Sequence, residues 1–294
     1  ETGIALGHQR LAIQDLSPAG KQPMRSKSGR YQIVYNGEIY NAKQLVVELA
    51  QGSECALDLV GHSDTEVLLA SIEAWGLQTA VSKCIGMFAF ALWDKNDEVL
   101  HLVRDRLGIK PLYYGQSRYT FLFGSELKAL KEHPDFESEI DRNALALYFR
   151  HNYIPAPYSI YKTYKKLEPG SILTVSRKGF STKITNYWGA WETINTSRNN
   201  PFDGSYEDAI DRLEELLSDS IRLRMLSDVP LGAFLSGGID SSLVVALMQK
   251  ESSRPVRTFS IGFEDDAYDE APFAKDVAKH LGSDHTELYV TAKQ

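Results

Sequence analysis

The alternation of strands and helices after residue 205 is the feature that most constrains how this chain can fold. An amphipathic pattern over 206–227 indicates a long helix. Apolar strand patterns and helical patterns then take turns, as strand 229–235, helix 242–251, strand 256–263, helix 269–281 and strand 285–290. Strands that alternate with helices usually pair in parallel, so this half is predicted to form a doubly wound α/β sheet.

Residues 1–190 show a different pattern, in which strand pairs dominate. The segments "GMFAFALWDKNDEVLHLVRD" (86–105) and "PLYYGQSRYTFLFGSE" (111–126) each indicate strand, turn and strand. The dipeptide Asn36-Gly37 between apolar runs predicts a hairpin turn, and 7–15 predicts a short strand. A helix is expected from Asp64 to a stop at Gly76. Strand pairs with a few helices indicate an α+β domain with antiparallel sheets.

The two halves are separated by a segment rich in Asn, Ser, Thr, Gly and Pro that has no periodicity. We therefore predict a first domain at 1–190, a linker at 191–205 and a second domain at 206–294. The formal net charge is -7 and no basic patch is visible, so nucleic acid and anionic membranes are not expected partners. The two cysteines, Cys55 and Cys84, form no C-x-x-C pair, which favours a reducing, cytoplasmic compartment.

The junction "LSGGIDSSL" (235–243) places two glycines, three serines and an aspartate where the first parallel strand ends and a helix begins. Open α/β sheets bind ligands at the carboxyl ends of their strands. Glycines let backbone approach a phosphate closely, the helix start offers free N–H groups, and Asp240 is a candidate magnesium ligand. The alternative is an ordinary turn in which Asp240 or Ser241 only caps the helix, and composition alone favours neither. The spacing is not that of a Walker A loop.

The heptapeptide "SGGIDSS" resembles the pyrophosphate-binding loop (PP-loop) of the N-type ATP pyrophosphatases, whose fold is adenine nucleotide alpha hydrolase-like. The longer segment "LSDVPLGAFLSGGIDSS" (226–242) resembles glutamine-hydrolysing asparagine synthetases of the asparagine synthetase B type. The resemblance implies that the loop grips the pyrophosphate end of ATP and that Leu235 and Ile261 hold the adenosine. The implied ATP-binding residues are Leu235, Ser236, Gly237, Gly238, Asp240, Ser241, Ser242 and Ile261.

Five residues of the first half have ordinary structural interpretations one at a time, in a strand, a hairpin turn and a helix start. The resemblance implies instead a glutaminase domain, an N-terminal-nucleophile hydrolase with an αββα sandwich. In such a domain Arg10 binds the glutamine carboxylate, Glu38 and Asp64 hold its ammonium group, and Asn36 and Gly37 form an oxyanion hole. This chemistry is sensible, since arginine suits a carboxylate and N–H donors suit a developing oxyanion.

The family's nucleophile is a cysteine at the mature N-terminus, activated by its own α-amino group. Glu1 is not that residue, and Cys55 and Cys84 are interpreted as small hydrophobic residues. We therefore expect the nucleophile upstream of residue 1 and more of the synthetase domain beyond Gln294. On this view both domains are incomplete and the fragment itself is inactive.

The function implied by the resemblance is that of a ligase of amino-acid biosynthesis. Glutamine is hydrolysed to ammonia, magnesium-ATP activates aspartate to β-aspartyl-AMP with release of pyrophosphate, and ammonia displaces AMP to give asparagine. The expected partners are glutamine, aspartate and ATP, with a homodimer as a possible assembly. Two alternatives stay open: a related amidotransferase with another carboxylate acceptor, from a polysaccharide, peptide or β-lactam pathway, and a non-catalytic relative that binds nucleotide or glutamine.

Overall fold

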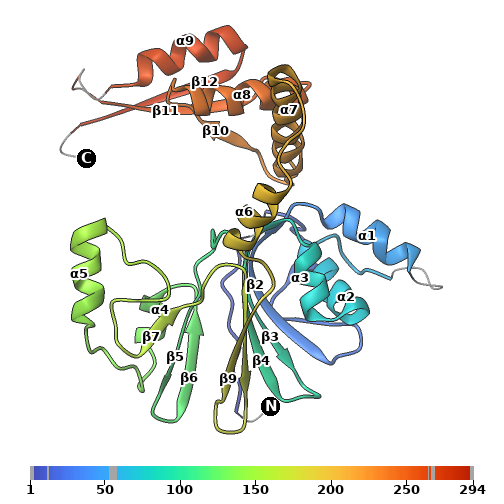
Figure 1. Cartoon of the computed structure of the whole chain (residues 1–294), viewed down its shortest axis with the longest axis vertical. Helices are drawn as coiled ribbons and strands as arrows, with labels where there is room; N and C mark the ends of the chain where they lie inside the picture. The colour runs from blue at the N-terminus through green and yellow to red at the C-terminus, as the bar shows by residue number, and fades with distance from the viewer. Residues whose placement is uncertain (1–2, 12, 53–57, 264, 266–268, 292–294) are drawn as a thin grey trace. The chain divides into compact units, whose positions relative to one another are not determined.

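The computed structural model describes residues 3–11, 13–52, 58–263, 265 and 269–291. The chain divides into two compact units, with the boundary between Asn200 and Pro201. Each unit is described by itself below, and the elements carry the labels of Figure 1. In the part of the chain that is described, no helix is both long and apolar enough to span a bilayer.

The described residues of unit 1 form two antiparallel sheets. The large sheet has the order β1-β2-β3-β4-β8-β9, and the small sheet has the order β6-β5-β7. The strands of the large sheet are β1 (Met24–Arg25), β2 (Tyr31–Ile39), β3 (Gly86–Asp94), β4 (Val99–Arg104), β8 (Ser171–Ser176) and β9 (Thr182–Asn186). Those of the small sheet are β5 (Tyr113–Ser117), β6 (Thr120–Gly124) and β7 (Tyr164–Lys166). The predicted strand pairs over 86–105 and 111–126 are confirmed.

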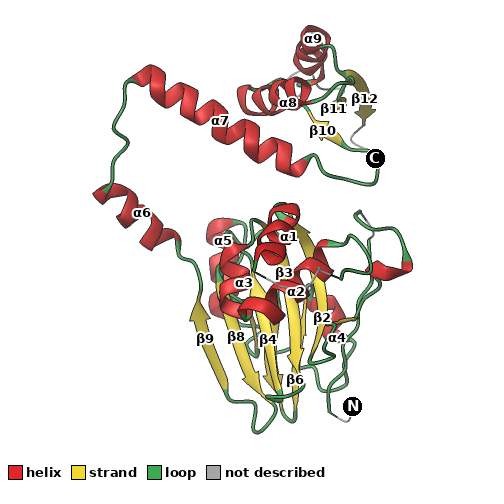
Figure 2. Cartoon of the chain, turned by 90° about the vertical axis from the view of Figure 1, so that its right-hand side faces the viewer, coloured by secondary structure: helices red, strands yellow, loops and turns green. Residues whose placement is uncertain are grey.

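Helices lie on both sides of this pair of sheets (Figures 1 and 2). The helices of unit 1 are η1 (Pro18–Gly20), α1 (Ala42–Gln51), α2 (Asp64–Trp75), α3 (Leu77–Lys83), α4 (Leu127–Lys131), α5 (Arg142–His151) and α6 (Ala190–Asn199). One apolar core joins α1, α2 and α3 to the large sheet, and a second core fills the space between the two sheets. Helices α4 and α5 lie beyond the small sheet (Figure 1). The predicted αββα order is confirmed.

Two local predictions for unit 1 are wrong. Asn36 and Gly37 are not a hairpin turn but the middle of β2, which pairs without a break with β3. Gly37 is required there for close approach, because a Cβ on it would lie 2.2 Å from the Met87 carbonyl oxygen. The described residues of 7–15 form no strand, since Arg10 turns back onto the carbonyls of Gln14 and Asp15. Helix α6 occupies most of the segment predicted as a linker.

In its described part, unit 2 has a sheet of three parallel strands in the order β10-β11-β12, which confirms the predicted α/β pattern. Its elements are α7 (Tyr206–Arg224), β10 (Gly232–Phe234), α8 (Ile239–Glu251), β11 (Arg257–Phe263), α9 (Ala271–Leu281) and β12 (Asp284–Val290). Strand β10 is shorter than predicted because its partner β11 begins only at Arg257, which lies opposite Gly232. Helices α8 and α9 cover one face, and Phe259 and Ile261 on the other face are exposed.

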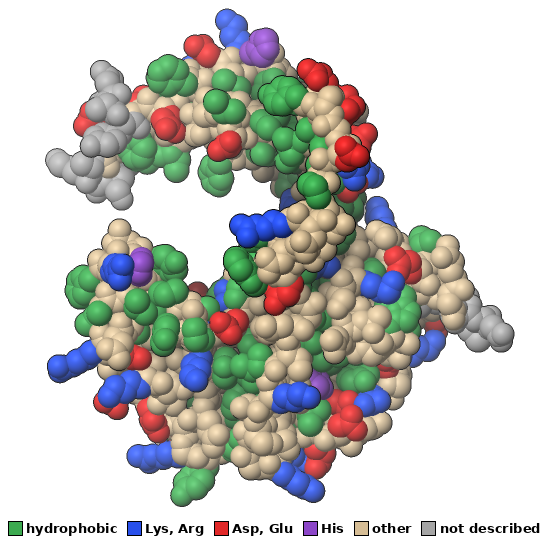
Figure 3. Space-filling model, viewed as in Figure 1, with side chains coloured by type: hydrophobic (Ala, Val, Ile, Leu, Met, Phe, Trp, Pro, Cys, Tyr) green, Lys and Arg blue, Asp and Glu red, His purple; other side chains and the backbone are tan. Residues whose placement is uncertain are grey.

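On the face seen in Figure 3, acidic side chains gather over α7. Lys and Arg side chains occur singly over unit 1 and do not gather into one patch.

Candidate functional site

A cavity of about 630 Å³ lies in unit 1. All five residues that the resemblance assigns to glutamine line it: Arg10, Asn36, Gly37, Glu38 and Asp64. They come from the segment before η1, from β2 and from the first turn of α2, so the fold brings together residues that lie far apart in the sequence. Further lining residues include His8, Gln22, Tyr35, Lys110, Ser125 and Glu126.

The cavity lies along an edge of β2 that no strand of the described residues covers beyond Ile33. The Tyr35 N–H points away from β3, because it donates to Oε1 of Gln22 at 2.6 Å. On β3, the Phe88 N–H and carbonyl are both bonded to Asp105, at 3.2 and 2.8 Å. Antiparallel pairs alternate between bonded and non-bonded positions, and Gly37 lies opposite Phe88. The Gly37 N–H therefore points away from β3, on the open edge of the strand.

The neighbours of Gly37 on this edge are already engaged. The Ile39 N–H donates to Oδ2 of Asp64 at 2.9 Å, as the Tyr35 N–H does to Gln22. The Asn36 side chain donates to the Ser125 hydroxyl over a long 3.4 Å and so has little to hold it there. Gly37 N–H and the Asn36 amide are therefore two donors at the cavity with capacity for an incoming oxygen atom.

Asp64 is the first residue of α2, after Ser63, whose side chain caps the helix by accepting from the Glu66 N–H. The Asp64 carboxylate is buried, and its Oδ2 accepts from the Tyr35 hydroxyl and from the Ile39 N–H, both at 2.9 Å. Burial raises the pKa of Asp64, while these hydrogen bonds oppose the rise. Asp64 is thus a buried carboxylate with no basic residue against it among the described ion pairs.

Glu38 is the second carboxylate of the cavity. Burial and the negative charge of Asp64 raise its pKa, whereas the positive charge of Lys110 lowers it. The backbone of Lys110 is fixed because its N–H donates to Oδ2 of Asp105 at 2.9 Å. The fully buried Asp105 also accepts from the Ile109 N–H at 2.9 Å, so one carboxylate orders the loop that carries Lys110.

Backbone carbonyls hold the positively charged side chain of Arg10 at the cavity. Its guanidinium donates to the carbonyls of Gln14 and Asp15 at 2.8 and 2.6 Å. It lies so close to Gly20 that a Cβ there would be 2.3 Å from Nη2. No carboxylate of a described residue forms an ion pair with Arg10, so its charge is oriented but not neutralised. The carboxylate of Asp15 accepts from the His62 N–H at 3.0 Å and ties this segment to the loop before α2.

Cys84 is not a nucleophile candidate in this structure. It is fully buried, its thiol donates to the Ala80 carbonyl, and burial raises its pKa to about 12. The prediction that Cys84 behaves as a small hydrophobic residue is confirmed, and Cys55 lies outside the described residues.

The loop between β10 and α8 is held by its own serines. The hydroxyls of Ser236 and Ser241 lie 2.9 Å apart, and Ser241 also donates to the Gly238 carbonyl at 3.2 Å. Gly238 is the residue before the helix and has no side-chain cap, so neither Asp240 nor Ser241 caps α8. Gly237 has a φ of 80° and a hypothetical Cβ only 2.7 Å from the Ala274 nitrogen, which requires glycine.

The remaining predicted nucleotide residues surround this loop. Leu235 is buried and donates its N–H to the Phe259 carbonyl, while the Ser260 hydroxyl donates to the Leu235 carbonyl. This places Leu235 beside the part of β11 that carries Ile261. Asp240 is exposed in the first turn of α8. The hydroxyl of Ser242 is buried and has no hydrogen-bond partner among the described residues.

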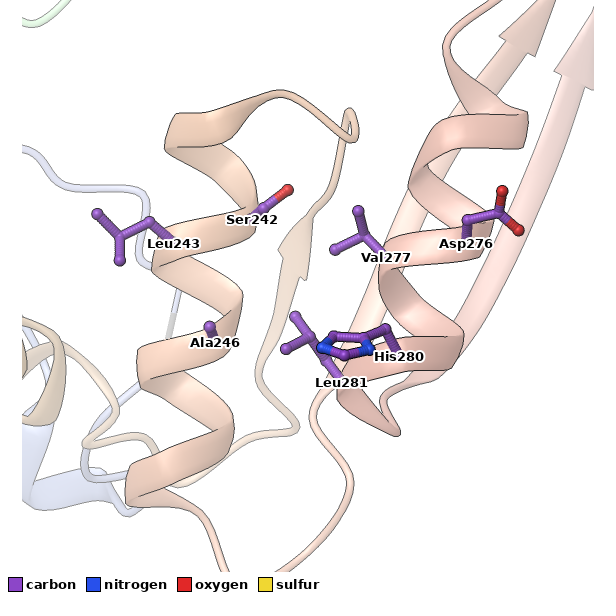
Figure 4. Close-up of a pocket in the computed structure, with 7 residues that line it drawn as sticks. All are labelled: Ser242, Leu243, Ala246, Asp276, Val277, His280 and Leu281. Atoms are coloured by element: carbon purple, nitrogen blue, oxygen red, sulfur yellow. The ribbon is translucent and has the colours of Figure 1, made fainter.

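A groove of about 500 Å³ runs between α8 and α9 (Figure 4). Val277, His280 and Leu281 lie on the side of α9 that faces α8, whereas the Asp276 carboxylate points away from it. The groove is almost entirely apolar, with Ser242 at one end, and it has no set of charged groups that would carry chemistry.

Sequence reasoning did not single out Gln22, Tyr35 or Lys110 as site residues. Tyr35 directly precedes Asn36, and Lys110 lies between the predicted strand pairs 86–105 and 111–126. Only the pairing of β2 shows that Gln22 and Tyr35 border the cavity.

Comparison with known proteins defines the class of protein to which this fold and cavity belong. Residues 1–188 match the family described as glutamine amidotransferase domain, and residues 212–294 match the family described as asparagine synthase. The chain belongs to the glutamine-hydrolysing asparagine synthetase family, which joins these two domains.

Curated relatives match along nearly the whole chain. Asparagine synthetase [glutamine-hydrolyzing] 3 of Bacillus subtilis is 35% identical over 100% of this chain and 48% of its own length. Asparagine synthetase [glutamine-hydrolyzing] 1 of the same organism is 37% identical over 99% of this chain and 44% of its own length. A putative asparagine synthetase 2 of Methanocaldococcus jannaschii is 38% identical over 97% of this chain and 56% of its own length. The chain thus spans about half the length of the relatives it matches.

Proposed function

We propose that unit 1 binds L-glutamine in the β2 cavity and serves its hydrolysis to glutamate and ammonia. The observation that carries the proposal is the charge pattern of the cavity. One space is lined by groups of both charges. Arg10 has no ion-pair partner among the described residues, and Glu38 and Asp64 supply two carboxylates. A free amino acid is a zwitterion, and its carboxylate and ammonium groups match these charges.

The residues divide the work as follows. Arg10 holds the α-carboxylate of glutamine, and Glu38 and Asp64 hold the α-ammonium group. The side-chain amide of the substrate then lies at the open edge of β2, where its carbonyl oxygen accepts from the Gly37 N–H and the Asn36 amide. Both donors are in place before the substrate arrives, so they stabilise the negative charge that develops on this oxygen during attack on the carbonyl carbon.

We propose further that unit 2 binds the phosphates of ATP at the loop 236–242. The glycine conformation at Gly237, the uncapped start of α8 and the orphan hydroxyl of Ser242 all fit phosphate oxygens. Leu235 and Ile261 hold the adenosine. Asp240 is the residue that would hold Mg²⁺, which neutralises phosphate charge when bound.

On this proposal the protein makes asparagine from aspartate, ATP and glutamine-derived ammonia. The names of its relatives indicate asparagine synthesis with glutamine hydrolysis for those proteins. Aspartate is activated as β-aspartyl-AMP with release of pyrophosphate. The expectations of a cytoplasmic location and of a homodimer stay predictions.

The glutamine assignment is tested by removing the ammonium group of the ligand and the charge of its proposed partner Asp64, each alone and both together. Binding of L-glutamine and of N-acetyl-L-glutamine, which lacks the ammonium group, is measured by calorimetry for the wild type and for Asp64→Asn. The wild type should prefer L-glutamine by roughly 30-fold or more, and Asp64→Asn should lose most of this preference. Asp58→Asn, a change at an exposed carboxylate paired with Lys27, is the matched control. Equal preference in Asp64→Asn and the wild type would refute the assignment.

A further inference from the structure

A buried tyrosine hydroxyl lies behind the carboxylate of Asp64 and has no part in the chemistry proposed so far. The Tyr35 side chain is 3% exposed, and its ring packs in the core between the helices and the large sheet. Its hydroxyl donates to Oδ2 of Asp64 at 2.9 Å, and the Ile39 N–H donates to the same oxygen at 2.9 Å. We infer that Tyr35 is a positioning residue, whose hydroxyl fixes one oxygen of Asp64 so that the other is presented to the ligand.

The two oxygens of Asp64 are not equivalent in this arrangement. Oδ2 accepts two short hydrogen bonds, one from the Tyr35 side chain and one from the Ile39 backbone, both on β2, and together they hold this oxygen in place. Oδ1 receives a longer contact of 3.4 Å from the Thr65 hydroxyl. Oδ1 is therefore the oxygen with capacity left for an ammonium group, and the ligand meets a carboxylate that cannot rotate freely.

The tyrosine is itself held in place from the cavity side. The side chain of Gln22 accepts from the Tyr35 N–H at 2.6 Å and donates to the Tyr35 carbonyl at 3.1 Å. The side chain of Gln22 thereby bonds to β2 as a neighbouring strand would, just before β1 begins at Met24. Its two hydrogen bonds fix the backbone of Tyr35 and so the origin of the ring that reaches Asp64.

The direction of the Tyr35–Asp64 hydrogen bond is set by chemistry. Burial and the charge of Asp64 raise the pKa of Tyr35 well above its ordinary value, so the hydroxyl keeps its proton and donates. A donated hydrogen bond favours the ionised carboxylate. Without the hydroxyl, the buried Asp64 takes up a proton at a higher pH and loses its attraction for a cation.

The test replaces the hydroxyl and keeps the ring. Tyr35→Phe is compared with the wild type and with Tyr164→Phe, a matched control that loses a hydroxyl from another fully buried tyrosine, far from Asp64 in the sequence and outside the cavity. The carboxyl carbon of Asp64, assigned with Asp64→Asn, is titrated by carbon-13 NMR. Calorimetry gives the dissociation constant of L-glutamine across the same pH range.

The inference rests on the proposed function only because it names L-glutamine as the ligand. The expected change in the Asp64 titration does not depend on that function. In Tyr35→Phe the Asp64 titration should move to higher pH, and L-glutamine should bind roughly ten-fold more weakly on the acidic side of that titration but nearly normally on its alkaline side. Tyr164→Phe should change neither. An Asp64 titration that is unchanged in Tyr35→Phe would overturn the inference. If the wild type binds no glutamine, the proposed function fails, and the titration still decides whether Tyr35 controls Asp64.

Discussion

Replacing Gly37 by alanine tests whether β2 and β3 approach as closely as the structure shows. The added Cβ would lie 2.2 Å from the Met87 carbonyl oxygen and 2.6 Å from the Phe88 Cα, both backbone atoms that no side-chain rotation can move. The strands must separate, and Gly37 lies between two bonded pairs, Asn36↔Ala89 and Glu38↔Met87. Overpacking of this kind typically costs about 1–3 kcal/mol, and strained hydrogen bonds on both sides favour the upper end.

A loss of about 3 kcal/mol predicts a fall of roughly 6–12 °C in the Tm of a unit of this size. Tryptophan fluorescence isolates the transition, because the four tryptophans, at 75, 93, 188 and 191, all belong to unit 1. Gly52→Ala is the matched control, since its Cβ would meet no atom closer than 3.7 Å. A Tm for Gly37→Ala within about 1 °C of the wild type would refute the close approach and, with it, the argument for the exposed N–H of Gly37.

Two further changes probe the charge of the cavity and the phosphate loop. Lys110→Met removes the cation that lowers the pKa of Glu38, so this pKa should rise, and L-glutamine binding should be lost at a higher pH on acidification than in the wild type. Lys27→Met, at an exposed ion pair, is the control, and coincident pH profiles would contradict the role of Lys110. Gly237→Ala combines a left-handed φ of 80° with a clash at the backbone of α9, and it should weaken ATP binding at least ten-fold and destabilise unit 2 by about 2 kcal/mol. Unchanged ATP affinity in calorimetry would show that the loop does not need this conformation.

The layers of both units could be predicted because their signals are local. Apolar runs on either side of a polar turn define β3 and β4, and the helical period defines α2 and α7. The hairpin predicted at Asn36-Gly37 was wrong because glycine after asparagine has two possible uses. One is a turn with positive φ, and the other is the close approach of a neighbouring strand, which is settled only by where β3 lies. Helix α6 has no buried residue, so it left no apolar pattern to detect.

The residues of the candidate site could be predicted from the sequence, but the residues that position them through hydrogen bonds could not. The resemblance implied roles for Arg10 and Asp64, and in the structure both residues line the same cavity. The hydrogen bonds that Tyr35 donates to Gln22 and to Asp64 join residues 13 and 29 positions apart. Such contacts follow from strand register and from the entry of α2 beside β2, neither of which has a signature in the order of the residues.

The central claim is that two separate sites divide the work, with glutamine at the β2 cavity and ATP at the loop 236–242. It is tested most directly in the protein as encoded by its gene, by measuring asparagine formation from glutamine and from ammonia in the variants Arg10→Ala and Asp240→Asn. The account predicts that Arg10→Ala loses roughly 100-fold or more with glutamine and keeps its rate with ammonia, whereas Asp240→Asn loses both but still hydrolyses glutamine. Equal loss with glutamine and with ammonia in Arg10→Ala would contradict it.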